Sequence, residues 1–318
     1  MLLWIIPVSL VALVLLLAWG AYCKTFFQNR RKKEHIYALP KKTPAPLARR
    51  TRELIGALDQ VPYEAVEIRS TDGLRLFGRY YHVRDGAPLH IQLHGYRSYA
   101  MRDFCGGNPL VREYGHNTLV VDQRAHGKSE GHTISFGVHE RVDCLMWAEY
   151  AARRFGDKTP IFLTGISMGA ATVLMASALP LPKNVVGIIA DCPYSSPRAI
   201  IRKVIGDMKL PASVAYPFVR LGAFLFGGIR GLDTVSAADA VRKSNVPILI
   251  IHGEGDTFVP CEMSREIAKN SSNARLETFP DADHAMSYMT DTERYARVSI
   301  EFAEECLARY ANPSSKEE

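Results

Sequence analysis

Residues 160–169 read Pro160-Ile161-Phe162-Leu163-Thr164-Gly165-Ile166-Ser167-Met168-Gly169, an apolar run that ends in a Gly-x-Ser-x-Gly motif. The run predicts a buried strand, and the small apolar residues from Ala170 to Ala178 predict a helix directly after the motif. A strand, a sharp turn and a helix form the context in which this motif exposes a serine hydroxyl above a sheet. We therefore interpret Ser167 as a nucleophile rather than as part of an ordinary Gly/Ser turn.

Two candidate partners for this serine follow it in the chain order acid, then histidine. The run Val246–Gly253 predicts a buried strand, and Asp256 lies in the loop after it. The run Arg275–Pro280 predicts a short strand, and His284 comes shortly after it. Because sites in parallel sheets form outside the carboxyl ends of the strands, we expect Ser167, Asp256 and His284 to lie at one edge of a sheet.

These residue types suit nucleophilic catalysis. A serine hydroxyl needs a base, imidazole suits that task near neutral pH, and a carboxylate fixes the imidazole tautomer and stabilises the imidazolium. Four other carboxyl groups compete for the role of the acid, namely Glu254, Asp281, Asp283 and Asp191. Asp191 follows another predicted strand and is the main rival. The Gly-Asp-x-x-Val-Pro context favours Asp256.

The chain resembles the α/β-hydrolase superfamily over about residues 62–311, in its serine esterase and serine aminopeptidase-like branches. Besides the Ser167 motif, the resemblance rests on His94-Gly95-Tyr96-Arg97 after the strand Pro88–Leu93, and on the turn Asp122-x-Arg124-x-x-Gly127-x-Ser129. It implies an α/β fold with a mainly parallel sheet of about eight strands, helices on both faces and a small helical cap insertion at about 194–239.

The resemblance also implies two N–H donors for an oxyanion hole. They are the amide of Tyr96, after the His-Gly pair, and the amide of Met168, after the nucleophile. Tyr96 and Arg97 replace the small residues common at these positions in the family, so the implication is weaker for Tyr96 than for Met168. Asp122, Arg124 and His126 take the family's structural role of fixing their loop.

The order of apolar segments agrees with this fold. Strands are predicted at 64–69, 74–83, 89–94, 117–122, 160–164, 185–191, 246–252 and 274–279, the first two as antiparallel edge strands. Helices are predicted at 100–114, 138–155, 168–179, 260–270 and 291–311. Alternating elements of this kind imply a mainly parallel sheet that is covered on both faces.

Residues 1–23 predict a transmembrane helix, because Leu2–Tyr22 is almost entirely apolar and about 20 such residues span a bilayer. No Lys or Arg precedes the run, which opposes a cleaved signal peptide. Residues 24–61 form a basic, proline-containing linker, and 10 of the 39 basic residues lie between Lys24 and Arg52. Positive flanks favour a single-pass protein with a cytoplasmic catalytic domain, and the stretch also suits anionic headgroups.

Composition limits the remaining possibilities. The 318 residues carry a net charge of +6, and the chain has no nucleic-acid-binding motif, so no nucleic-acid partner is expected. The six scattered cysteines lack a Cys-x-x-Cys pair, which argues for reduced thiols and against a zinc site or disulfide framework. No metal and no cofactor are predicted. Residues 312–318 form a polar tail.

The segment after Asp191 bears on the substrate. Residues 198–208 predict a basic amphipathic helix, and residues 212–228 are richly apolar. Two interpretations of the apolar part stay open. It lines a hydrophobic pocket over Ser167 or admits substrate from the membrane, or it packs as an ordinary helix on the sheet.

The leading functional hypothesis is a membrane-anchored serine hydrolase that cleaves carboxylic esters or thioesters, lipid-like ones included, through an acyl-enzyme. Its partner is then a small-molecule or lipid-like acyl substrate. Two other enzymes fit the same residues, a serine aminopeptidase-like peptidase and an acyltransferase. A hypothesis from a different class is a catalytically silent, membrane-tethered binding protein, but such proteins usually lose one of the three residues that this chain keeps.

Overall fold

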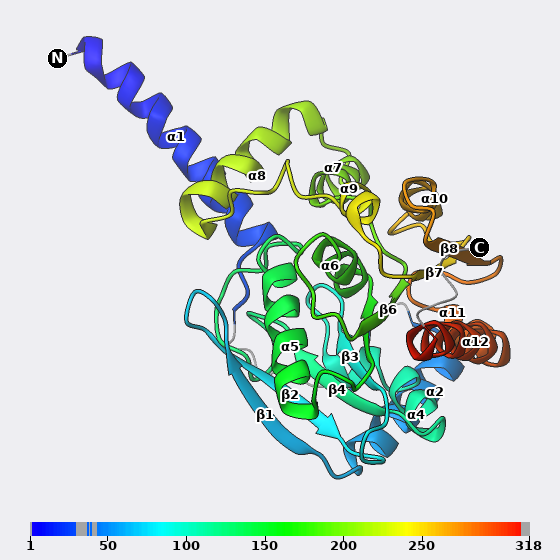
Figure 1. Cartoon of the computed structure of the whole chain (residues 1–318). Helices are drawn as coiled ribbons and strands as arrows, with labels where there is room; N and C mark the ends of the chain where they lie inside the picture. Colours follow the sequence, from blue (N-terminus) through cyan, green and yellow to red (C-terminus); the bar gives the residue numbers. More distant parts are fainter. Residues whose placement is uncertain (1, 30–36, 38, 40–42, 313–318) are drawn as a thin grey trace.

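An eight-stranded sheet in the order β1-β2-β4-β3-β5-β6-β7-β8 forms the centre of the molecule (Figure 1). The structure is a computed structural model that describes residues 2–29, 37, 39 and 43–312. The strands are β1 Glu64–Arg69, β2 Arg75–Tyr81, β3 Leu89–Leu93, β4 Asn117–Asp122, β5 Ile161–Ile166, β6 Val185–Asp191, β7 Ile248–Gly253 and β8 Ala274–Phe279. Strand β2 pairs in antiparallel fashion with both β1 and β4, and the other five strand pairs are parallel. The predicted mainly parallel sheet of about eight strands is confirmed.

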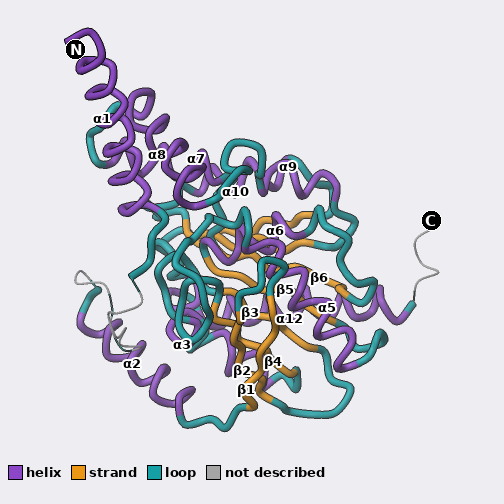
Figure 2. The backbone as a smooth tube through the Cα atoms, turned by 90° about the vertical axis from the view of Figure 1, so that its left-hand side faces the viewer, coloured by secondary structure: helices purple, strands orange, loops and turns teal. Residues whose placement is uncertain are grey.

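Helices cover both faces of the sheet, as predicted (Figures 1 and 2). Their bounds are α1 Leu2–Thr25, α2 Ala45–Asp59, α3 Ala100–Asp103, α4 Gly107–Glu113, α5 Glu140–Phe155, α6 Met168–Ala176, α7 Pro197–Asp207, α8 Ala212–Gly227, α9 Ala237–Ala240, α10 Cys261–Lys269, α11 Ser287–Thr290 and α12 Thr292–Ala311, with a 3-10 turn at Val241–Lys243. The central strands β3, β4, β6 and β7 are buried at every position. Burial on both faces explains why the sequences of β6 and β7 are nearly continuous apolar runs rather than alternating ones.

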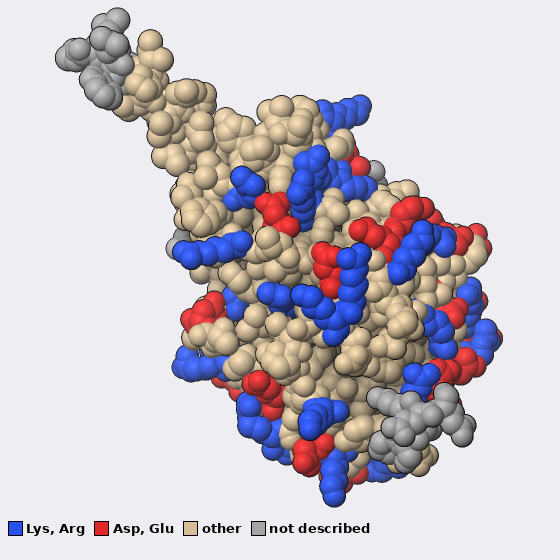
Figure 3. Space-filling view, turned by 45° about the horizontal axis from the view of Figure 1, so that its top comes forward, with Lys and Arg blue, Asp and Glu red and all other residues tan. Residues whose placement is uncertain are grey.

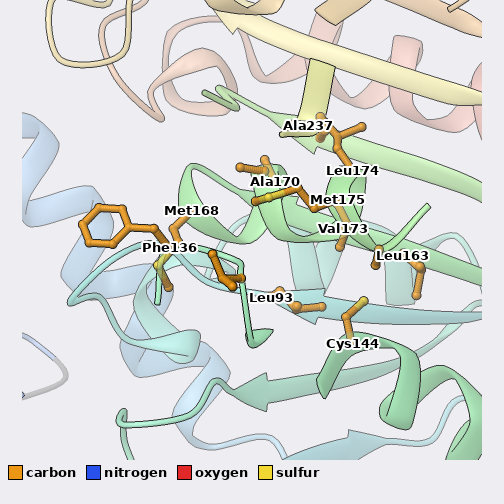
Figure 4. Packing of buried hydrophobic residues seen from close by; sticks show 14 of the residues in the cluster. Leu93, Phe136, Cys144, Leu163, Met168, Ala170, Val173, Leu174, Met175 and Ala237 are labelled. Carbon is orange, nitrogen blue, oxygen red and sulfur yellow. The ribbon is translucent and has the colours of Figure 1, made fainter. Parts of the chain in front are cut away.

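Helix α6 lies at the centre of the larger hydrophobic core. All nine of its residues are buried (Figure 4), and the small residues Gly169, Ala170 and Ala171 let the first turn pack closely under the sheet. Leu93 and Leu163 of the sheet, Cys144 of α5 and Ala237 of α9 belong to the same cluster. A second core lies on the opposite face, where Val298 and Phe302 of α12 join Phe162, Ile189 and Leu249. The strands next to α6 are thus packed by a hydrophobic core on each face of the sheet.

The structure differs from the sequence expectation in two segments. The single helix predicted at 100–114 is two helices, α3 and α4, which are separated at Phe104–Gly106. Gly106 packs against the Tyr288 ring, since a Cβ at Gly106 would lie 2.2 Å from Tyr288 Cε1. Within the segment interpreted as a linker, residues 45–59 form α2, because Ala48, Thr51, Ile55 and Leu58 recur at helical spacing and are buried.

We expect Gly169→Ala to destabilise the fold by at least about 3 kcal/mol, because the new Cβ would meet the Leu93 carbonyl oxygen at 1.9 Å and backbone cannot give way cheaply. Gly56→Ala in α2 is the control. Its Cβ meets nothing within 4 Å, so the substitution should add about 0.5–1 kcal/mol through helix propensity. Urea unfolding of the detergent-solubilised chain measures both effects. Equal stabilities for the two variants would contradict the close approach.

Candidate active site

Ser167 lies in the turn between β5 and α6. Its φ of 55° and ψ of −112° fall in a region that residues with a side chain rarely occupy. Close packing holds the turn in place. A Cβ at Gly165 would lie 2.2 Å from the Gly169 carbonyl carbon, and one at Gly169 would meet the backbone of β3. Both glycines of the motif are therefore required by the approach of neighbouring backbone, which fixes Ser167 at the carboxyl edge of the sheet.

His284 and Asp256 reach Ser167 from the loops after β8 and β7. The distance from His284 Nε2 to Ser167 Oγ is 2.9 Å, and that from His284 Nδ1 to Asp256 Oδ2 is 2.6 Å. With Nδ1 donating to the carboxylate, Nε2 is left to accept the proton of the serine hydroxyl. The structure thus brings together the three side chains that the sequence singled out, in the order serine, imidazole, carboxylate.

The Asp256 carboxylate has further donors. Its Oδ1 accepts hydrogen bonds from the N–H groups of Phe258 and Val259 at 2.9 and 2.7 Å. Burial by itself would raise the pKa of Asp256, but hydrogen bonds from His252 and His284 outweigh it and hold that pKa well below its ordinary value. The carboxyl group therefore faces the imidazole in its charged form, the form that stabilises an imidazolium.

His252 is a member of this network that the sequence analysis did not single out. It is fully buried. Its Nε2 donates to the Val259 carbonyl oxygen at 2.8 Å and lies 3.3 Å from Asp256 Oδ2, and its Nδ1 accepts from the Ser264 hydroxyl at 2.6 Å. The side chain braces the loop that carries the acid. The available signal was a polar residue inside the apolar run of β7, four positions before Asp256.

The amides of Met168 and Tyr96 are the two candidate donors to an oxyanion. Met168 is the first residue of α6, where N–H groups have no acceptor within their own helix. The loop after β3 adjoins the serine, since a Cβ at Gly95 would lie 3.4 Å from Ser167 Cβ. Tyr96 and Ser167 line the same cavity. The arrangement suits an oxyanion that forms next to Ser167.

The side chains of Tyr96 and Arg97 connect this loop to the end of α1. The Tyr96 hydroxyl donates to the Thr25 carbonyl at 2.7 Å, and its ring stacks on Phe136 with 4.8 Å between the centroids. The Arg97 guanidinium donates to the carbonyls of Lys24 and Phe27 at 3.1 and 2.9 Å. The two residues that depart from the family pattern therefore make bonds to a segment outside the hydrolase domain.

The Asp122–Ser129 turn supports the same loop from the other side. The Arg97 N–H donates to His126 Nε2 at 3.0 Å. Burial, and secondarily the neighbouring His94, lower the pKa of His126 well below its ordinary value, so this ring is a neutral acceptor. Arg124 forms two hydrogen bonds to Asp143, at 2.6 and 2.7 Å. These contacts agree with the loop-fixing role implied by the resemblance.

A cavity of about 310 Å³ opens beside Ser167 and His284. It lies between α3 and α4 on one side and α11 and α12 on the other. Its wall is mainly apolar, with polar groups among the strand residues. Phe104, Leu110, Ile166, Ile189, Gln92 and Thr164 belong to this lining. None of the described residues of α8 belongs to it. The structure therefore does not support the interpretation that residues 212–228 line the pocket; α8 packs against α1 (Figure 2).

One set of potential metal ligands occurs among the described residues. Donor atoms of Cys192, Asp256 and His284 lie within 4.8 Å of one another. Burial raises the pKa of the Cys192 thiol well above its ordinary value, which disfavours the thiolate that a metal would need. Asp256 and His284 are already bonded to each other. The set is accounted for by the serine-linked network, and we assign no ligand to it.

Comparison with known proteins identifies the family. The sequence profile of the alpha/beta hydrolase family matches residues 93–298. The chain belongs to this family. The matched region contains Ser167, Asp256 and His284 and the loop that carries Tyr96. Together with the eight-stranded sheet, the match makes the protein an esterase-like or lipase-like α/β-hydrolase in the broad sense.

Several relatives and solved structures are similar to the chain. The uncharacterized protein YqkD of Bacillus subtilis is 25% identical over 273 residues, 84% of this chain and 89% of YqkD. Lysophosphatidylserine lipase ABHD12 of Danio rerio is 26% identical over 57% of this chain, which spans 46% of the lipase. Esterase Pf2001 of Pyrococcus furiosus has the same fold, with a TM-score of 0.62, 24% identity, and coverage of 80% of this chain and 93% of the esterase.

Asp191, the rival acid, ends β6 beneath Ser167. Its carbonyl accepts from the Ser167 N–H at 2.8 Å, and its carboxyl group bonds to Tyr295. Burial raises the pKa of Asp191 to about 6, against the lowering effects of His252, Tyr295 and His284. Between about pH 4 and pH 6 the Asp191 carboxyl group is therefore protonated in the folded protein and ionised in the unfolded chain. Stability falls as the pH rises from about 4 to about 6 and stays reduced above that.

We therefore expect Asp191→Asn to be more stable than the native chain at pH 8, by on the order of 2–3 kcal/mol. The difference should vanish near pH 4, where the folded and unfolded chains both carry the proton. Urea unfolding of both proteins at the two pH values measures it. If the stability difference between the two proteins does not depend on pH, or if the variant is less stable at pH 8, the folded protein stabilises the ionised Asp191 carboxylate and the prediction is wrong.

Proposed function

We propose that this protein is a membrane-anchored serine hydrolase that cleaves carboxylic esters through Ser167, His284 and Asp256. The observation that carries the proposal is the pair of hydrogen bonds, 2.9 and 2.6 Å long, that join the serine hydroxyl to the imidazole and the imidazole to the carboxylate. The strained backbone at Ser167 adds to it, because strain of this kind is concentrated at functional sites.

In the proposed reaction the Ser167 Oγ attacks the ester carbonyl carbon while its proton passes to His284 Nε2. The N–H groups of Tyr96 and Met168 then donate to the oxyanion, a contribution of about 10²–10³-fold for each donor. The tetrahedral intermediate expels the alcohol, which takes the proton from His284, and leaves an acyl group on Ser167. Water, deprotonated by the same imidazole, attacks that acyl group and releases the carboxylic acid. Asp256 stabilises the imidazolium in both halves.

Two features support a small or single-chain acyl substrate. The cavity beside Ser167 has about 310 Å³, at the lower end of the range for small-molecule sites, and its wall is mainly apolar. Among the relatives, one named as a lysophosphatidylserine lipase and one named as a bifunctional esterase/perhydrolase, from Acinetobacter calcoaceticus, suggest esters rather than peptides. We infer that the acyl group enters the space between α4 and α12.

The membrane part of the proposal rests on α1. Among the described residues, Ile6–Thr25 is the one segment that is long and apolar enough to cross a bilayer. Its side chains before Ala18 project from the domain. The basic residues that follow it in the sequence favour a cytoplasmic location for the hydrolase domain. We propose a single membrane span with the site on that side.

A fluorophosphonate probe tests the enzymatic proposal, because it forms a covalent bond to a serine that is activated by an imidazole. We expect labelling of the native full-length chain and a loss of at least about 100-fold in Ser167→Ala, in parallel with hydrolysis of p-nitrophenyl butyrate. The exposed Ser272 provides the control, since Ser272→Ala should be labelled at the native rate. An unlabelled but folded native protein would favour a binding protein over an enzyme.

A series of p-nitrophenyl esters tests the location of the acyl group. We expect kcat/KM to rise about fourfold for each added methylene, at about 0.8 kcal/mol each, until the cavity is filled. Leu110→Trp in the cavity wall should shorten the preferred chain. Val214→Ser on α8 should leave the preference unchanged. If Val214→Ser changes the preferred chain length and Leu110→Trp does not, the acyl group binds under α8 instead.

A further inference from the structure

Exposed apolar side chains are concentrated in two neighbouring parts of the molecule. Of the nineteen large hydrophobic side chains exposed in the described residues, nine lie on α1 and six lie between Met208 and Phe226. The six are Met208, Leu210, Val214, Phe224, Leu225 and Phe226. In Figure 3 the surface without charged side chains continues from α1 onto the adjoining part of the molecule. An exposed apolar surface of this extent marks an interaction site.

Helix α8 is packed on the last turns of α1. A Cβ at Gly222 would lie 2.3 Å from the Ala18 carbonyl oxygen, so the two backbones approach closely, as small residues allow in membrane helix pairs. The rings of Trp19 and Phe226 meet edge to face with 4.9 Å between their centroids. Figures 1 and 2 show α8 beside the base of α1 from two directions.

The apolar face of α8 is distinct from the face that packs. Val214 and Leu225 are 60% and 46% exposed, and they are eleven residues apart, which is about three helical turns and therefore the same face. Phe218 and Leu221 fall between them at helical spacing and are partly exposed. The buried residues Tyr216, Val219, Gly222 and Ala223 occupy the other side. One side of helix α8 is thus packed against the protein, and the opposite side is apolar and exposed.

The length of the proposed span brings this face to the bilayer. Ile6–Thr25 has 20 residues and measures about 30 Å, the thickness of the hydrocarbon core. Helix α8 contacts α1 at Ala18 and Trp19, inside that span. A bilayer that covers Ile6–Thr25 therefore reaches the depth of α8. Trp19 and Tyr22 lie in the same region, and such aromatic residues favour the membrane interface.

The charged residues on and around α8 are compatible with a position of this helix at the bilayer surface. Its one charged residue, Arg220, lies outside the apolar face and is bonded to Asp233 at 3.4 Å. Lys209 precedes the helix and Arg230 follows it, with the Arg230 guanidinium 5.8 Å from the centre of the Phe224 ring. Basic residues that flank an apolar face are positioned to meet lipid phosphates.

We propose that α8 is a second membrane-binding element, whose Val214–Leu225 face lies in the acyl region of the leaflet next to the hydrolase domain, beside α1. The proposal rests on the proposed anchor but not on the proposed chemistry. Two membrane contacts, in place of one helix on a linker, hold the hydrolase domain in one orientation toward the lipid.

Site-specific fluorescence on the full-length chain tests the proposal. In a Cys23→Ser background, since the other five cysteines are buried, single cysteines replace Val214 or Leu225 and are labelled with the dye NBD. Leu10→Cys reports on α1. Asp85→Cys, at the amino end of β3 and fully exposed, is the control remote from the site edge. The proteins are reconstituted into phosphatidylcholine–phosphatidylglycerol vesicles, with or without doxyl-labelled lipids.

We expect doxyl lipids to quench the dye at positions 214 and 225 at least about half as strongly as at position 10, as suits a helix face about 5–10 Å below the headgroups. Position 85 should be quenched by iodide alone. Quenching at 10 but not at 214 or 225 overturns the proposal. Shielding of 214 and 225 from both quenchers, with a dimer on cross-linking, would instead assign the face to a second copy. If doxyl lipids do not quench the dye at position 10, the proposed membrane anchor is wrong. Ester hydrolysis is measured on the same samples, so the proposed chemistry is tested independently of membrane binding.

Discussion

The approach of α6 to β3 is the contact on which the site depends. Gly169 lies so close to the Leu93 carbonyl that no side chain fits between them, and Gly165 lies against Gly169 in the same way. Ser167, the central residue of the motif, has a positive φ of 55° within this closely packed turn. The cost of that backbone, of order 1–3 kcal/mol, is offset by the fully buried α6. A well-packed core therefore holds the Ser167 side chain in the position from which its hydroxyl reaches His284.

The second constraint joins the proposed anchor to the loop beside Ser167. Tyr96 and Arg97 donate to the carbonyl groups of Thr25 and Lys24 at the end of α1, where a helix leaves its last acceptors without partners, and Arg97 also donates to the Phe27 carbonyl just after it. The same loop is held from the other side by the neutral ring of His126. Helix α1 thus does more than extend from the domain, because its last residues help to determine where the Tyr96 amide lies.

The sequence predicts most of the fold and the positions of three central side chains. Apolar runs and partly alternating segments, with turn residues between them, locate all eight strands, and Ser167, Asp256 and His284 lie together at one sheet edge in the structure. His252 could not be assigned in this way, because its role depends on the curvature of the loop that carries Asp256. The break between α3 and α4 was missed for a similar reason, since the Tyr288 ring that packs on Gly106 comes from a distant segment.

The apolar segment at 212–228 shows why composition does not decide what a segment covers. Its residues suit a wall of an acyl pocket and a lipid-facing helix equally well, because both environments exclude water. The structure distinguishes the two. Gly222 packs closely against Ala18, so one side of α8 is covered by α1, and none of the described residues of α8 lines the cavity. The cavity is instead closed by α3, α4, α11 and α12 on the opposite face of the sheet from α6. The uncovered face of α8 and the wall of the cavity are therefore formed by separate elements, so either can change without repacking the other.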